Sequence, residues 1–182
     1  MKKIIILIFL ISNSFNAQIL DEKDRAQKIN EILKYRFENI LPDLMDKTDI
    51  DMWVLISREY NEDPVLKTML PAEWLNARRR TILVFYRNKE NNTLDKLAVA
   101  RYNFGENIIS AWDKESQPNQ WLRLNEIIEE RNPKKIGLNF SKYFNIADGL
   151  DKTDYDEFMS NISSLNKKKI GSAQKLTTAW IE

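Results

Sequence analysis

The sequence predicts a single α/β domain in which a mixed β-sheet is flanked by helices. Three observations lead to this class. Short apolar runs typical of buried strands alternate with amphipathic helical segments along the chain. Two of these runs flank the short polar stretch "KENN", which favours an antiparallel hairpin. A later helical segment leads straight into "NPKKIGLN", the return from helix to strand that layered α/β sheets contain.

The chain begins with the layout of a secretory signal peptide. Residues 1–17, "MKKIIILIFLISNSFNA", combine two lysines, an apolar run from Ile4 to Ile11, and small or polar residues before an expected cleavage near Ala17. The apolar run is shorter than the about 20 residues that span a bilayer, so no stable membrane insertion is expected. We therefore predict export to the periplasm or the cell exterior, with 165 residues (182 − 17) in the mature chain.

Amphipathic helices are expected over three segments, residues 21–49, 119–132 and 151–163. In the first, apolar residues recur at spacings of three and four and form one stripe. The stripe consists of Ile29, Ile32, Leu33, Phe37, Ile40, Leu41, Leu44 and Met45. Asp21 is a candidate N-cap of this helix, and Pro42 is expected to kink or restart it.

Strands are expected over residues 51–57, 78–88, 94–103, 134–140 and 169–177. The first run is apolar almost throughout, so we expect it to be buried on both faces. Residues 104–119 are expected to be irregular, with one short edge strand. The domain should cover residues 18–176. Residues 177–182, "TTAWIE", begin a further apolar segment.

The composition narrows the chemistry that this chain can perform. It has no histidine, which excludes Ser-His-Asp and Cys-His catalysis, and no cysteine, so that the usual zinc-binding sets are excluded as well. Removal of Lys2 and Lys3 leaves 26 basic residues (28 − 2) against 27 acidic ones. This balance creates no overall field that would attract nucleic acid. Carboxylate, lysine, tyrosine or hydroxyl chemistry remains.

The loop "SREYNEDP", residues 57–64, carries the most suggestive group of polar residues. Glu59, Glu62 and Asp63 follow a predicted strand, where α/β proteins often place their chemistry. Carboxylates this close could share acid–base work or hold a hard cation such as Mg²⁺ or Ca²⁺, although their spacing matches no calcium loop. The alternative is a solvated turn without a functional role.

Three consecutive arginines, Arg78 to Arg80, stand at the entrance of the next predicted strand. Alternation along a strand would place Arg78 and Arg80 on the same face and Arg79 on the other. The arginines could pair with the carboxylates of the 57–63 loop, or clamp a carboxylate ligand. Ordinary structural ion pairs are the alternative.

Read in order, several segments resemble the N-terminal domain of secreted or periplasmic Xaa-Pro aminopeptidase-like proteins. These proteins belong to the M24 metallopeptidase family, which includes prolidase and creatinase. The resemblance covers about residues 25–182, and its most specific pieces are "SREYNEDP" with "RRRTILVF" and "NPKKIGLN" with "DGL". None of these pieces is a catalytic signature.

The resemblance implies a ribonuclease H-like topology without catalytic or metal-binding residues of its own. In the family, a following domain binds two divalent metal ions, such as Mn, Co or Zn, with two Asp, one His and two Glu, and the metal-bound water attacks the bond before proline. The N-terminal domain helps to form a homodimer and walls one side of the peptide-substrate cleft. The implied cleft candidates in this chain are Arg58, Glu59, Tyr60, Asp63, Arg78 and Arg80. The resemblance also implies that residues 177–182 begin the linker to a catalytic domain, and that this chain ends where that domain would begin. Trp180 and Ile181 would then be exposed, because they would pack on the missing domain.

Two other functions stay open at this point. The chain could be a stand-alone periplasmic protein-binding module that pairs with a separate catalytic chain. It could also be an independent hydrolase that uses the carboxylates of the 59–63 loop.

Overall fold

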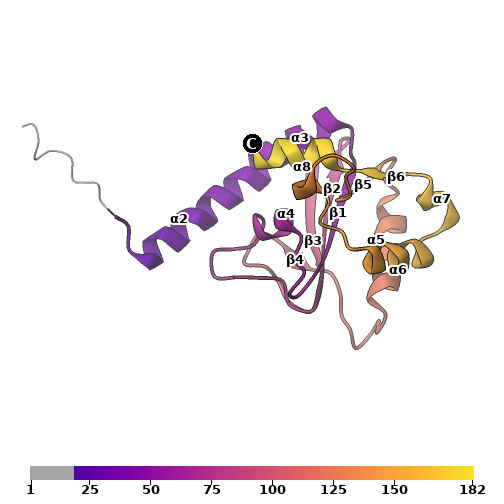
Figure 1. Cartoon of the computed structure of the whole chain (residues 1–182), viewed down its shortest axis with the longest axis horizontal. Coiled ribbons are helices and arrows are strands. Elements are labelled where there is room, and N and C mark those ends of the chain that lie inside the picture. The colour runs from indigo at the N-terminus through magenta and orange to yellow at the C-terminus, as the bar shows by residue number, and fades with distance from the viewer. Residues whose placement is uncertain (1–18) are drawn as a thin grey trace, which may run out of the picture.

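The computed structural model describes residues 19–182 and confirms the α/β class with a mixed sheet (Figure 1). The predicted signal peptide lies outside the described residues. The six strands are β1 (Met52–Arg58), β2 (Arg80–Asn88), β3 (Thr93–Val99), β4 (Ile109–Ser110), β5 (Ile136–Leu138) and β6 (Ile170–Ser172), in the order β4-β3-β2-β1-β5-β6. β1, β2 and β3 are antiparallel neighbours, whereas β4 is parallel to β3, β5 to β1 and β6 to β5.

The central strands explain why the sheet divides the core in two. Six consecutive residues of β1, from Met52 to Ser57, are buried, as the apolar run predicts. Trp53 and Leu55 point to one face, and Val54 and Ile56 to the other. β2 and β3 form the predicted hairpin, with the polar residues 89–92 at the turn.

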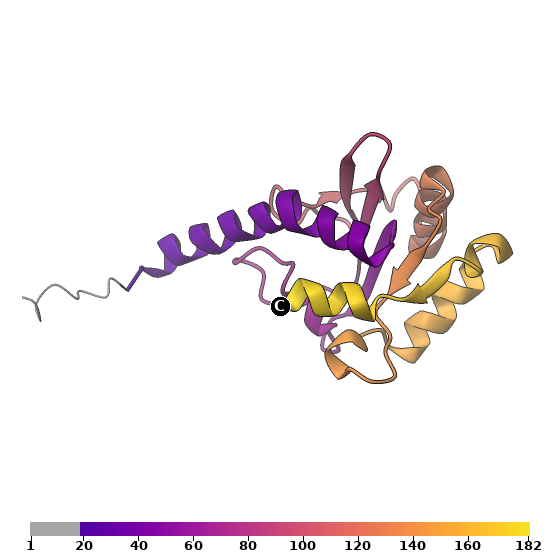
Figure 2. The ribbon, with the colours of Figure 1, turned by 90° about the horizontal axis from the view of Figure 1, so that it is seen from above.

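Helices cover both faces of this sheet (Figures 1 and 2). The bounds are α2 (Glu22–Tyr35), the π-helix η1 (Arg36–Ile40), α3 (Leu41–Thr48), α4 (Pro64–Lys67), α5 (Gln120–Arg131), the 3₁₀-helix η2 (Asn145–Ala147), α6 (Lys152–Asn161), α7 (Ser164–Lys167) and α8 (Gln174–Ile181). η1, α3, α4 and α8 pack on the face of Trp53, whereas α5 and α6 pack on the face of Val54. No helix within residues 19–182 is long and apolar enough to cross a membrane.

The first long helix is restarted at Pro42, as predicted, through the single π-helical turn η1 that leads into α3. The predicted N-cap is also confirmed, because Asp21 accepts a hydrogen bond of 2.8 Å from the backbone N–H of Asp24. The buried stripe, however, begins only at Leu33. Ile29 and Ile32 are 44% and 52% exposed, because this part of α2 runs away from the sheet and has no core opposite it (Figure 2).

The C-terminal segment differs from its prediction. The last strand ends at Ser172, and residues 174–181 are the helix α8 rather than strand and linker. Trp180 was expected to be exposed and is fully buried, while Ile181 is partly exposed. The indole stacks on Phe37 at 5.6 Å and donates a 2.7 Å hydrogen bond to Thr68 Oγ1. Leu176 and Trp180 stand four residues apart, so a helix places both on the buried face.

Candidate functional site

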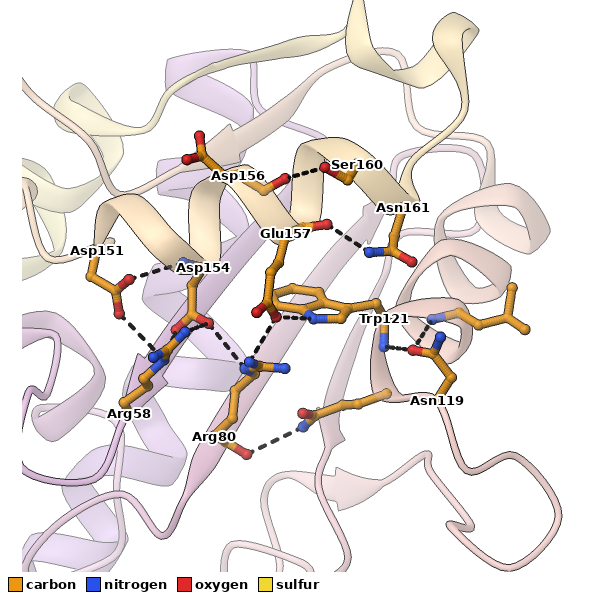
Figure 3. Close-up of polar contacts among 12 residues, drawn as sticks. Arg58, Arg80, Asn119, Trp121, Asp151, Asp154, Asp156, Glu157, Ser160 and Asn161 are labelled. Atoms are coloured by element: carbon orange, nitrogen blue, oxygen red, sulfur yellow. Dashed lines mark hydrogen bonds and ion pairs between the residues drawn. The ribbon is translucent and has the colours of Figure 1, made fainter.

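The two polar segments predicted as a site meet at one end of the sheet, where the central strand β1 ends and β2 begins. β1 ends at Arg58 and β2 begins at Arg80, and the antiparallel register pairs these two residues directly. α6 lies across this end and supplies carboxylates to it (Figure 3). Arg58, Arg80 and the loop that begins at Ser57 therefore lie close to α6, at the boundary between the core and the surface.

Arg58 and Arg80 converge on one buried carboxylate, that of Asp154 in α6 (Figure 3). Arg58 donates from Nε and Nη2 to the two oxygens of Asp154, at 2.9 and 2.7 Å. Arg80 Nε lies 3.0 Å from Asp154 Oδ1, close enough for an ion pair but at an angle that makes no hydrogen bond. Asp154 is 0% exposed, and its hydrogen bonds raise the pKa of Arg58 above the ordinary value.

A second carboxylate completes the surroundings of Arg80. Arg80 Nη2 donates to Glu157 Oε2 at 2.8 Å, and the same oxygen accepts a 2.7 Å hydrogen bond from the indole N–H of Trp121. The guanidinium also stacks over the Trp121 ring, 4.5 Å from its centroid. β2, α5 and α6 are thus joined at one point, and the charge of Arg80 is neutralised there.

These contacts correct the predicted partners of the arginines. The carboxylates that neutralise Arg58 and Arg80 come from α6, not from the 57–63 loop. The predicted alternation also fails, because β2 begins at Arg80, and Arg78 and Arg79 precede it in a turn. Sequence spacing does not reveal that α6 crosses this end of the sheet, so the correct partners could not be predicted from it.

Asp63 is buried and holds the candidate loop together from inside. Its side chain caps the short helix α4, which the sequence did not predict, by accepting from the backbone N–H groups of Val65 and Leu66 at 2.7 and 3.3 Å. Its other oxygen accepts a 2.8 Å hydrogen bond from Asn139. Asn139 in turn accepts from the Trp53 indole at 2.7 Å. Asp63 therefore faces no groove on the surface.

The Asp63 carboxylate is closely packed and electrostatically perturbed. Burial raises its pKa above the ordinary value of 3.8, although the hydrogen bonds from Asn139, Val65 and Leu66 oppose this effect. A Cβ atom added to Gly149 would lie only 2.4 Å from the carboxyl carbon of Asp63. The glycine of the "DGL" segment is thus required where its backbone approaches this carboxylate.

Two left-handed residues shape the surface of the loop. Tyr60, with φ of 70°, stands at the tip of the turn after β1 and is 89% exposed. Arg79 has φ of 51°, an unusual backbone conformation for a side chain of this kind. Glu59 holds it in place, because its carboxylate accepts the Arg79 N–H at 3.0 Å and its own N–H donates to the Arg79 carbonyl at 2.7 Å.

Beside this turn lies an open groove of about 680 Å³, here called the cationic groove. Its lining residues are Glu59, Asn76, Arg78, Arg79, Arg80, Ala100, Arg101, Tyr102, Trp112, Lys114 and Gln120. Of the predicted candidates, the groove brings together Glu59, Arg78 and Arg80. Arg58, Tyr60 and Asp63 do not line it.

Arg101 and Lys114, two further cations that line the groove, were not predicted as site residues. Arg101 follows the end of β3, and Lys114 lies in the irregular segment before α5. Because β3 is antiparallel to β2, its end lies beside the start of β2, where Arg80 stands. The predicted hairpin could therefore have placed Arg101 near Arg80. No pattern in the sequence indicates that Lys114 lies near them.

The donor sets in this region do not favour metal chemistry. Within residues 19–182, no group of three or more His, Cys, Asp or Glu residues is arranged to hold a metal ion. The family resemblance assigns its two divalent ions to a following catalytic domain and none to these residues. This end of the sheet instead offers the closely grouped cations of the groove, beside ion pairs that hold Arg58 and Arg80.

Comparisons with known proteins add no identity: no family model matches the sequence, and no curated protein matches it either.

Proposed function

We propose that this chain is the non-catalytic N-terminal domain of an Xaa-Pro aminopeptidase-like metallopeptidase, serving dimerisation and formation of the substrate cleft. The strand order is the observation that carries the proposal. A ribonuclease H-like sheet places an antiparallel meander of three strands first and adds parallel strands beyond the first of them. The order β3-β2-β1-β5-β6 has this form, with β4 as an additional edge strand.

The contacts of the candidate residues Arg58, Asp63 and Arg80 support a non-catalytic role. Arg58 and Arg80 are held by Asp154, and Asp63 is engaged by Asn139 and by the backbone of α4. These groups connect elements of the domain instead of pointing at a shared reaction centre. In the proposed enzyme, the metal ions and the chemistry belong to the catalytic domain.

The test combines an activity assay with a measurement of self-association. The purified protein is incubated with an Xaa-Pro peptide and Mn²⁺, Co²⁺ or Zn²⁺, beside a complete Xaa-Pro aminopeptidase as the positive control. We expect no hydrolysis by this chain and a dimer in sedimentation equilibrium. Metal-dependent cleavage would contradict the non-catalytic role, and a monomer at all concentrations would contradict the role in dimerisation.

A second candidate is a stand-alone periplasmic module that binds another protein. The cationic groove favours it, because groups of unneutralised cations at a surface suit recognition of a charged partner. The two candidates differ in the sedimentation experiment. A protein-binding module needs no dimer, and its association should appear only when the partner is added.

A further inference from the structure

We propose that the cationic groove binds an acidic peptide segment through the carboxylates of that segment. This inference goes beyond the proposed function and does not depend on it. It rests on the charge of the groove, on the way its cations are held, and on the shape and chemistry of its walls.

The groove concentrates positive charge on a chain that is nearly neutral overall. Its lining contains five cationic side chains and one carboxylate, whereas the complete sequence has a net charge of +1. Within residues 19–182, Asp154 and Glu157 neutralise Arg80, but no ion pair neutralises the other four groove cations. These four are Arg78, Arg79, Arg101 and Lys114. Like charges this close repel one another, so an anion in the groove would relieve the repulsion.

The single carboxylate in the lining does not remove this charge. Glu59 accepts the backbone N–H of Arg79, and this contact fixes the turn that carries Arg78 and Arg79. The carboxylate therefore acts as a positioning group. Its replacement would alter the presentation of the arginines as well as the charge of the groove.

Aromatic contacts further restrict the cations on one side of the groove. The guanidinium of Arg78 lies over the ring of Trp74, 5.3 Å from its centroid. Tyr102 stacks on the same indole at 5.0 Å and donates a 3.2 Å hydrogen bond to the Arg78 carbonyl. A guanidinium held in this way loses less freedom on binding, which favours affinity.

Two further lining residues, Trp112 and Gln120, are also held by hydrogen bonds. The Trp112 indole N–H donates to the carbonyl of Gln117 at 2.7 Å. Gln120 donates to the carbonyls of Val99 and Arg80, at 2.6 and 3.2 Å, and so ties the ends of β3 and β2 together. A volume of about 680 Å³ lies within the range of about 300–1,000 Å³ typical of ligand sites, which suits a few residues of an extended peptide.

The chemistry of the walls favours a peptide over a nucleic acid. Guanidinium groups form paired hydrogen bonds with carboxylates, and the half-buried faces of Tyr102 and Trp112 suit the apolar side chains between them. Single-stranded nucleic acid requires aromatic faces on which bases stack, along a continuous basic track. Here the overall charge is balanced, and the basic residues gather at one groove instead of forming such a track.

The experiment measures binding of a fluorescein-labelled hexapeptide rich in glutamate and leucine, by fluorescence anisotropy. Its matched control is the same peptide with every glutamate replaced by glutamine. We expect the acidic peptide alone to bind, and its affinity to fall as NaCl rises from about 50 to about 300 mM. In the double variant Arg101→Gln/Lys114→Gln, we expect the affinity to fall about tenfold, because two exposed ion pairs are lost.

A charge-matched control separates the groove from the net charge of the protein. The variant Lys168→Gln/Lys175→Gln removes two exposed lysines that flank the edge strand β6 in sequence and do not line the groove, and it should bind the acidic peptide like the wild type. Equal weakening in both double variants would overturn the proposal, as would equal binding of the glutamine peptide. Tighter binding of a labelled oligothymidine than of the acidic peptide would also overturn it, in favour of a nucleic-acid ligand.

Discussion

The arginines around the end of β1 and the start of β2 have two different environments, although they stand close together. On the anchored side, defined as Arg58, Asp63 and Arg80 with their partners Asn139, Asp154 and Glu157, the charged groups are hydrogen-bonded or ion-paired. In the cationic groove, Arg78, Arg79, Arg101 and Lys114 have no ion-pair partner within residues 19–182. Only Arg80 belongs to both regions.

This difference separates charges that stabilise the fold from charges that are available to a ligand. A buried carboxylate such as Asp154 must remain paired, because an unpaired charge in the interior costs several kcal/mol. Exposed cations remain solvated, and leaving them unpaired costs the protein little. Substitutions on the anchored side should therefore change stability, whereas substitutions in the groove should change binding.

The largest expected effect is at Asp154. Asp154→Asn keeps the shape but removes the charge that neutralises Arg58 and Arg80, and we expect a loss of about 2–3 kcal/mol in the free energy of unfolding. Urea denaturation followed by tryptophan fluorescence measures it. The control is Asp156→Asn on the same helix, where an exposed carboxylate pairs with Lys152 and a change below about 0.5 kcal/mol is expected. Equal effects at both positions would contradict the distinction between the two regions.

A steric test of the anchored side comes next in size. Gly149→Ala forces a methyl group against the Asp63 carboxylate, and we expect a loss of about 1–3 kcal/mol because this site is already filled. Gly171→Ala is the control, since a Cβ atom there meets nothing within 4 Å. Both variants are compared by thermal unfolding. An unchanged midpoint in Gly149→Ala would show that Asp63 moves freely, and that the loop is not anchored from inside.

A third test uses the raised pKa of Asp63. The folded protein keeps the proton on Asp63 at pH values where the unfolded chain has released it. The contribution of this group to stability is therefore greatest below pH 3.8 and is lost as the pH rises through the raised pKa. The variant Asp63→Asn should retain the cap of α4, but its side chain does not titrate and so removes this pH dependence.

The measurement is the difference in unfolding free energy between wild type and Asp63→Asn, followed from acidic to neutral pH. We expect the advantage of the wild type to shrink as the pH rises. If that advantage grew instead, the hydrogen bonds from Asn139, Val65 and Leu66 would outweigh the effect of burial.

The elements that local pattern determines were predicted well. The apolar run of β1, the hairpin around "KENN" and the helix that follows Asn119 all depend on neighbours in sequence, and the structure confirms them. The helix over residues 174–181 was missed, because the residue pattern predicted a strand as far as residue 177 and the resemblance suggested a linker after it. The four-residue spacing of Leu176 and Trp180 is a local signal, and it could have predicted this helix.

The candidate site was predicted only in part, because it depends on contacts between distant segments. The sequence placed Arg58, Asp63 and Arg80 near one another, but the carboxylates that pair with the two arginines stand more than seventy residues away in α6. The groove likewise needs the loop that carries Lys114 to fold back beside the start of β2. Such contacts follow from the arrangement of elements, which residue patterns alone do not define.

The smallest expected effect tests the groove side of the comparison. Arg101→Gln removes an exposed cation that has no ion-pair partner within residues 19–182, so we expect the free energy of unfolding to change by less than about 0.5 kcal/mol. The change should be towards higher stability, because one repulsion among the groove cations disappears, and it should vanish as NaCl rises to about 300 mM and screens these charges. Urea denaturation at low and high salt measures both properties. A loss of stability comparable with that of Asp154→Asn would mean that Arg101 serves the fold, and that the groove and the anchored side do not differ in kind.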